Sequence, residues 1–174
     1  MMQDTIALIK RIKVDALYGK KKHFNAADRK EKYHYWIGIP LLVLNIISGS
    51  ILFYVLTDGV EGWIKYVPLF ITLLTALLSG FQTFLNHEKK VEGHRRVGNK
   101  YLSIMKKSKR LESYLKDNVL PKPEIIKRLD SLADEIESVN IEAEVFPTNQ
   151  QDYNDAKKGI EDGEETYTVD ELDT

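Results

Sequence analysis

Two long apolar stretches dominate the pattern of hydrophobic and polar positions along this chain. No residue that is ionised at pH 7 lies between Tyr33 and Thr57, a stretch of 25 residues, or between Tyr66 and His87, a stretch of 22 residues. About 20 apolar residues in an α-helix are enough to cross a hydrocarbon core of roughly 30 Å. The pattern therefore predicts two membrane-spanning helices, over 35–57 and 66–87.

The segment 58–65 between the two stretches is short and contains turn-forming residues. Asp58 and Gly59 favour a tight turn, so the two spans are expected to form an antiparallel hairpin around an external loop. Trp36 and Trp63 stand at ends of the spans, where aromatic side chains favour the membrane interface. Two buried helices of a soluble bundle are the alternative, and they would need a sheath of further helices that 174 residues do not provide.

Outside the spans the sequence predicts further helices. We expect a helix in the cytoplasmic segment 1–34 and another over 88–117, which continues the second span without a break. Pro121 and Pro123 then interrupt the chain, because a proline disfavours helical geometry in the residue before it.

A heptad pattern marks the helix expected over 123–145. Its apolar positions advance by alternating steps of four and three, as in a packed helical seam. The seam consists of Ile125, Leu129, Leu132, Ile136, Val139 and Ala143. It could pack on the helix 88–117 of the same chain or join the same helix of a neighbouring chain.

The net charge of −1 conceals an uneven distribution. The segments carry +5 over 1–32, −1 over 58–65, +7 over 88–110, −5 over 111–151 and −7 over 152–174. Because basic residues flank the outer ends of both spans, the positive-inside rule places both termini in the cytoplasm.

The acidic C-terminal segment 146–174 has little apolar content, and we expect it to be disordered. The fold class predicted from the sequence is thus an all-α membrane protein. It comprises a two-helix transmembrane hairpin, cytoplasmic helical extensions and a flexible acidic tail.

Small and hydroxylated residues gather on one face of each span. This stripe consists of Asn45, Ser48 and Gly49 in the first span and of Thr72, Thr75, Ala76, Ser79, Gly80 and Thr83 in the second. Such residues let membrane helices approach closely and form hydrogen bonds between them. The two halves could face each other inside one hairpin, or they could mediate oligomerisation or line a pore. Two helices cannot enclose a water-filled path, so a pore would require several chains.

Candidate chemistry is sparse. The chain has no cysteine, and His23, His34, His87 and His94 are isolated along the sequence, so packing or headgroup roles are expected for them rather than metal binding. His87 and Glu88 begin like a zinc-protease motif but lack the second histidine four positions on. We therefore expect no enzyme, no metal and no cofactor.

Basic residues before the first span are assigned to membrane orientation. Lys20, Lys21 and Lys22 are expected to lie near anionic headgroups, and no nucleic-acid binding is expected.

The order of short motifs resembles the SLATT family, the two-membrane-helix effectors of prokaryotes that accompany nucleotide-synthesising SMODS or nucleotide-sensing SLOG proteins. The resemblance covers residues 5–145. It is carried by the run from Phe24 to Arg29, by the two spans and by the segment from Glu88 to Leu102. The motif residues are Phe24, Asn25, Ala26, Arg29, Glu88, His94 and Tyr101.

This resemblance implies a non-enzymatic effector of bacterial anti-phage or abortive-infection defence. Such a protein would oligomerise in the inner membrane and permeabilise it when a partner sensor or nucleotide signal triggers it. Because no sensor domain is recognised in the chain, a separate protein is expected to supply the trigger. The alternative is a non-toxic membrane anchor or adaptor that recruits a soluble partner through its cytoplasmic helices.

Overall fold

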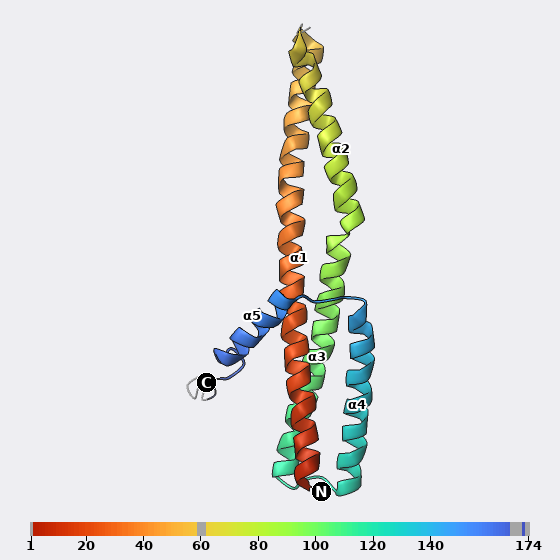
Figure 1. Ribbon diagram of the computed structural model, residues 1–174, viewed down its shortest axis with the longest axis vertical. Coiled ribbons are helices and arrows are strands. Elements are labelled where there is room, and N and C mark those ends of the chain that lie inside the picture. Colours follow the sequence, from red (N-terminus) through yellow and green to blue (C-terminus); the bar gives the residue numbers. More distant parts are fainter. Residues whose placement is uncertain (1, 59–61, 168–171, 173–174) are drawn as a thin grey trace. The chain divides into compact units, whose positions relative to one another are not determined.

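The computed structural model describes residues 2–58, 62–167 and 172. Within these residues every regular element is helical, as the sequence predicts. The elements are α1 (Met2–Asp58), the 3-10 helix η1 (Trp63–Tyr66), α2 (Val67–Leu85), α3 (His87–Lys116), α4 (Lys122–Glu144) and α5 (Gln150–Glu161) (Figure 1).

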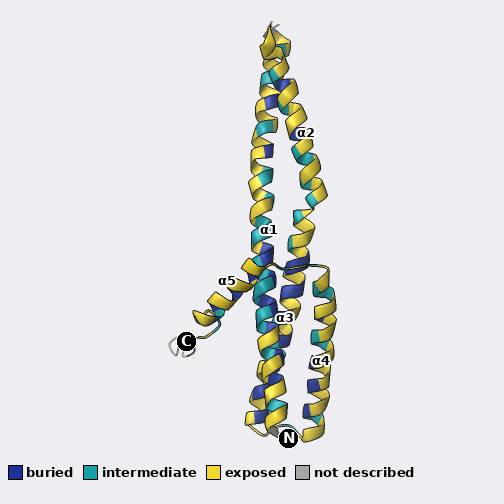
Figure 2. Cartoon of the chain, in the orientation of Figure 1, coloured by how far each residue is buried: buried dark blue, intermediate teal, exposed yellow. Residues whose placement is uncertain are grey.

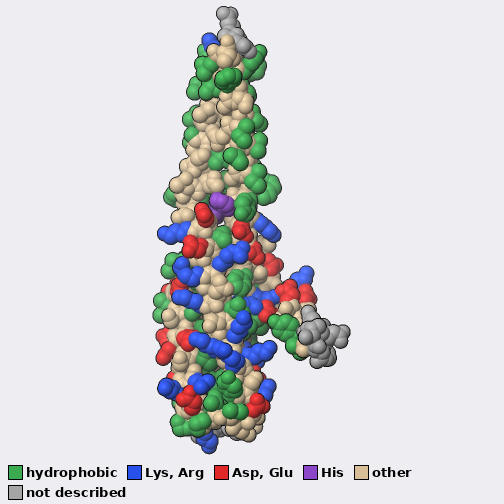
Figure 3. All heavy atoms as spheres, turned by 180° about the vertical axis from the view of Figure 1, so that it is seen from behind, with side chains coloured by type: hydrophobic (Ala, Val, Ile, Leu, Met, Phe, Trp, Pro, Cys, Tyr) green, Lys and Arg blue, Asp and Glu red, His purple; other side chains and the backbone are tan. Residues whose placement is uncertain are grey.

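The chain divides into two compact units. One unit, here called the bundle unit, comprises 1–28 and 91–174, and the other, the hairpin unit, comprises 29–90. Buried residues gather in the bundle unit, whereas the hairpin unit is mostly exposed along both of its helices (Figure 2). On the face that Figure 3 shows, charged side chains gather on the bundle unit, whereas apolar side chains line the edges of the hairpin unit. Both uncharged stretches of the sequence lie in the hairpin unit, which also includes the charged residues 29–32 and 88–90.

A single core holds the bundle unit together. It joins the first part of α1 to α3 and α4, which lie side by side in Figure 1. Its buried members are Ile9, Ile12, Ala16, Val97, Tyr101, Ile104, Leu111, Leu115, Ile125, Leu129, Leu132 and Val139. Ile136 and Ala143 pack against this core, so all six residues of the heptad seam make their contacts inside one chain. This is the intramolecular one of the two arrangements that the sequence left open.

The hairpin unit pairs the second part of α1 with α2. The Ser48 hydroxyl lies 2.9 Å from the Thr72 hydroxyl and donates to the backbone carbonyl of Pro68 at 3.3 Å. Leu41, Ser48, Pro68 and Thr75 are buried along this contact. The predicted turn falls on 59–61, which lie outside the described residues, and Gly62 follows with a φ of 90°.

Two helical stretches are long and apolar enough to cross a membrane. They are Gln3–Thr57 and Trp63–Lys116, and only 11% of the most apolar window of each is buried inside the structure. A core helix of a soluble protein would be mostly buried, whereas here the apolar side chains face outward. The exposed set includes Leu42, Ile46, Phe53, Leu69, Phe70, Leu73, Leu77 and Phe81.

The structure corrects the expected helix boundaries at two places. The helix expected in 1–34 and the span expected over 35–57 form one continuous helix, Met2–Asp58, with Pro40 inside it. The helix expected to run unbroken from the second span through 88–117 instead stops at Asn86, which has a left-handed conformation with φ of 45°. Asparagine tolerates this conformation better than most residues, which makes it an effective helix terminator.

The expectation of disorder over 146–174 is wrong for α5. Asn149 caps this helix: its side chain accepts a hydrogen bond from the Asp152 amide at 2.9 Å, and the Asp152 carboxylate accepts one from the Asn149 amide at 2.8 Å. Such a reciprocal capping box satisfies backbone donors that the first turn leaves unpaired. The low apolar content of the segment concealed this local signal.

Candidate functional site

The family-like motifs meet at a buried junction inside the bundle unit. His23 of α1 and His94 of α3 are 4% and 1% exposed, and their Nδ1 atoms lie 3.1 Å apart. One ring must donate its Nδ1 proton to the other, so this hydrogen bond cannot form when both rings are charged. The aromatic rings of Tyr101 and Phe146 lie against the pair, with centroids 5.7 Å from His23 and 5.8 Å from His94.

Glycines allow these rings to enter the junction. A Cβ atom on Gly98 would lie 2.9 Å from Cε1 of Phe24, and one on Gly93 would overlap the ring of Phe146. Ala26 and Ala27 are also fully buried. The small residues of the motifs are therefore explained by close packing around the two histidines.

Hydrogen bonds tie two further motif residues, Asn25 and Tyr101, to α5 and α4. The Asn25 amide donates to the backbone carbonyl of Asp152 at 3.1 Å, and the Tyr101 hydroxyl donates to Asn140 Oδ1 at 2.7 Å. Burial raises the pKa of the Tyr101 phenol, so it remains a donor. The junction consequently joins all four helices of the bundle unit.

A carboxylate of α4 adds a charged clamp beside the junction. Glu142 pairs with Lys100 and, at 2.8 Å, with Arg96 Nε. Hydrogen bonds from Lys100 and then Arg96 lower the pKa of Glu142. The Arg96 guanidinium also lies 5.6 Å from the Phe146 ring centroid.

His23 is held in its neutral form. Burial, followed by the nearby His94 and Lys22, lowers the pKa of His23 from 6.5 to about 4, while Asp152 opposes this shift. No cluster of three or more metal-ligating side chains occurs among the described residues. The two histidines can therefore contribute packing at neutral pH and respond to protonation as the pH falls.

Replacing Gly93 by alanine should destabilise the bundle unit. In an open helix this change is favourable by up to about 1 kcal/mol, but here the new methyl group must displace the Phe146 ring, and such overpacking costs about 1–3 kcal/mol. Thermal unfolding followed by circular dichroism should show a lower midpoint. In a Phe146→Ala background the same change should cost nothing, and a raised midpoint for Gly93→Ala alone would refute the packing argument.

Two motif residues lie outside the junction. Arg29 and Glu88 belong to the hairpin unit, and Glu88 is exposed. The other five, Phe24, Asn25, Ala26, His94 and Tyr101, belong to the bundle unit.

The structure divides the stripe of the spans into two parts. Ser48, Thr72 and Thr75 take part in hydrogen bonds at or beside the α1–α2 contact, and Ser79 is half-buried. The other members are exposed: Asn45, Gly49, Ala76, Gly80 and Thr83. The Asn45 amide and the Thr83 hydroxyl donate to carbonyls of their own helices, those of Leu41 at 3.0 Å and Ser79 at 3.0 Å. A Cβ atom on Gly49 or Gly80 would meet nothing within 4 Å.

Sequence reasoning missed several residues of the bundle unit. Val97, Ile104 and Ser108 are buried on α3, and Glu112 pairs with Lys13 at 2.5 Å. Val97, Ile104 and Leu111 recur at steps of seven, which was a usable signal. The His23–His94 pair joins positions 71 residues apart and has no local signal.

These features define a class of protein: an all-α chain with two candidate membrane-spanning helices and a charged helical bundle. The chain belongs to the SMODS and SLOG-associating 2TM effector domain family 4, SLATT_4, whose model matches residues 7–171. The match begins two residues after the start of the sequence resemblance over 5–145, but it extends past residue 145 and includes α5. No curated protein and no solved structure matches the chain.

Proposed function

We propose that this protein is a non-enzymatic effector that assembles in the bacterial inner membrane and permeabilises it when a separate sensor or nucleotide signal triggers it. Membership of a 2TM effector family of conflict systems supports an effector role. The proposal depends most on the unused part of the stripe. Gly49, Ala76 and Gly80 are exposed on the surface of the hairpin, and the contact between α1 and α2 is formed by other residues of the stripe.

A second hairpin can use this open face. Association of helices in lipid depends on close van der Waals packing, and Ala76 and Gly80, spaced by four, let a neighbouring backbone approach. The exposed hydroxyl and amide groups of Thr83 and Asn45 could then contact other chains or water. Several hairpins are needed, because two helices alone do not surround a path for ions.

The structure bears on the alternative of a membrane adaptor. The alternative recruits a soluble partner through the cytoplasmic helices, and the apolar seam of one of them is not accessible, because Ile125, Leu129, Leu132 and Val139 are buried in the core of the bundle unit. The observation favours the effector, and expression in cells separates the two.

Reporter fusions test the topology on which the proposal depends. A fusion at residue 60 should be active only on the periplasmic side, and fusions at either terminus only in the cytoplasm, because net charges of +5 and +7 flank a loop of −1. Paired reporters that require opposite compartments serve as mutual controls. A cytoplasmic loop would contradict the proposed arrangement.

A further inference from the structure

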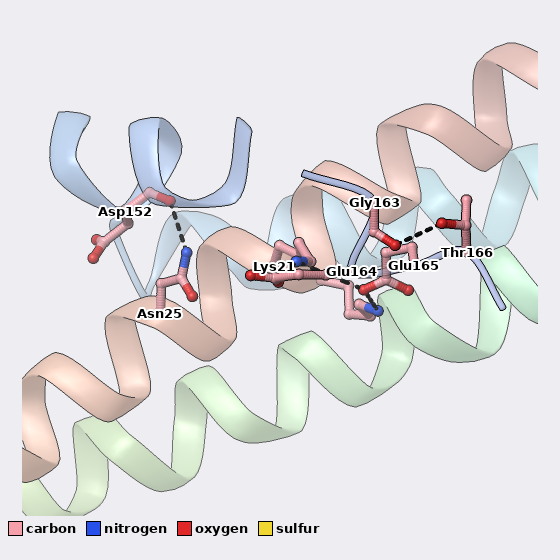
Figure 4. A network of polar contacts seen from close by, with 8 residues as sticks. Lys21, Asn25, Asp152, Gly163, Glu164, Glu165 and Thr166 are labelled. Atoms are coloured by element: carbon pink, nitrogen blue, oxygen red, sulfur yellow. Dashed lines mark hydrogen bonds and ion pairs between the residues drawn. The ribbon is translucent and has the colours of Figure 1, made fainter. Parts of the chain in front are cut away.

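The acidic end of the chain is docked on two lysines of α1. Lys20 Nζ lies 2.5 Å from Glu165 Oε1, and Lys21 pairs with Glu164 and, at 3.9 Å, with Glu165 (Figure 4). The lysine side chains are only 10% and 11% exposed. The sequence placed Lys20 and Lys21 beside lipid headgroups, whereas here carboxylates of the same chain occupy them.

The turn after α5 is shaped to present these carboxylates. Gly163 has a φ of 83°, and the amide of Glu164 donates to the carbonyl of Gly159 at 3.1 Å, which is the geometry that closes a helix with a left-handed residue. A Cβ atom on Gly159 would lie 2.6 Å from Lys21 Nζ, so only glycine lets the ammonium group lie this close to the α5 backbone. Thr166 Oγ1 donates to the Gly163 carbonyl at 2.6 Å and fixes the turn.

The contact between α5 with its following turn and α1 is mostly polar, so another anion can replace the tail carboxylates. The residues that α5 buries are Asp152, Ala156 and Gly159, none of them a large apolar side chain. At its other end α5 is held by the Asn25–Asp152 hydrogen bond and by stacking of Tyr153 on Tyr18, with centroids 5.9 Å apart. Little apolar burial opposes its release, and the two neighbouring ammonium groups that the carboxylates leave are then free to pair with another anion.

We propose that Lys20 and Lys21 form a binding site for a phosphate-bearing anion, occupied in the resting chain by Glu164 and Glu165, so that binding of the anion releases α5 from α1. A di- or triphosphate group carries adjacent negative charges that match two neighbouring ammonium groups and forms strong charge-assisted hydrogen bonds. The tail competes as a tethered ligand at high effective concentration, which weakens the apparent affinity for any free anion. The phosphate could belong to a soluble ligand or to a lipid headgroup.

The test uses the full chain in phosphatidylcholine nanodiscs, with inorganic tripolyphosphate as the probe. The chain has no cysteine, so Asn154→Cys on the exposed face of α5 gives a single site for a spin label. Tripolyphosphate should increase the mobility of the label at concentrations at which sodium chloride of equal ionic strength does not. Calorimetry measures the binding of the probe directly.

Paired variants identify the site. Glu164→Gln/Glu165→Gln should bind tripolyphosphate at least about tenfold more tightly than the parent, because the internal competitor is gone. Asp155→Asn/Glu161→Gln removes the same number of charges from α5 positions that do not contact the two lysines and should leave the affinity within about twofold. Lys20→Gln/Lys21→Gln should abolish the binding of tripolyphosphate, and its spin label should be mobile even without the probe.

Anionic lipid tests whether the phosphate comes from a lipid headgroup. If the label becomes mobile in phosphatidylglycerol nanodiscs without the probe, and Lys20→Gln/Lys21→Gln abolishes the difference between the two lipids, the phosphate of the headgroup is the natural source. Equal affinity of the Glu164→Gln/Glu165→Gln variant and the parent for the probe, with no response to either lipid, would overturn the proposal. These readouts do not involve permeabilisation, so they stand apart from the proposed function.

Discussion

Replacing Gly80 with leucine should abolish assembly and toxicity together while the protein stays in the membrane at its normal level. Nothing lies within 4 Å of the position that a Cβ atom would take, so the larger side chain is accommodated within a single hairpin. A leucine also makes the span more apolar, which favours insertion. Any loss must therefore come from contacts with a second chain, where the added side chain would push backbones apart.

Leu77→Ile is the matched control for this change. Leu77 is exposed on the same helix, and the substitution preserves volume and hydrophobicity. Cross-linking in membranes, together with growth after induction, should show an unchanged control and a monomeric, harmless Gly80→Leu variant. A Gly80→Leu protein that is inserted, oligomeric and fully toxic would assign assembly to another surface.

Acidification from pH 6.5 to 4 should destabilise the bundle unit by on the order of 3 kcal/mol through His23 alone. The pKa of His23 is about 4 in the folded chain and 6.5 in the unfolded one, so the unfolded state binds more protons throughout this window. The contribution of His23 to the free energy of unfolding is therefore fully present above pH 6.5 and is lost as the pH falls towards 4. Protonation of the second ring also breaks the hydrogen bond between the two histidines.

His23→Gln separates this effect from other titrations. Glutamine keeps a hydrogen-bonding group beside His94 but does not titrate, so the variant should lose most of the pH dependence between 6.5 and 4.5. The carboxylates with lowered pKa values, such as Glu112 beside Lys13, act below this window. Chemical unfolding of both proteins at several pH values gives the comparison, and parallel curves would show that His23 does not carry the effect.

Strong periodic signals made part of this fold predictable. The apolar windows gave the two candidate spans, and the steps of four and three from Ile125 to Ala143 gave a seam that the structure buries within one chain. Both depend on the average of many side chains along one helix. One atypical residue therefore does not change the predicted helix.

Features that depend on a single residue or on distant pairs were not predicted. Asn86 ends α2 through one left-handed residue, and α5 depends on one capping box at Asn149 in an otherwise acidic segment. The junction brings together His23 and His94, which only the packing of α1 on α3 makes neighbours. The motif residues were recognised from the sequence, but their shared position around two buried rings was not.

Membrane potential after induction tests the central claim most directly. Cells that express the chain from a titratable promoter are followed with a potential-sensitive dye while the amount of protein in the membrane fraction is measured. The account predicts that the potential collapses, with entry of a normally excluded dye, above a threshold amount of the protein and before lysis, and that an equal amount of Gly80→Leu protein leaves the potential intact. A chain that accumulates in the membrane to the same amount without changing potential or growth would contradict a permeabilising effector and favour the anchor.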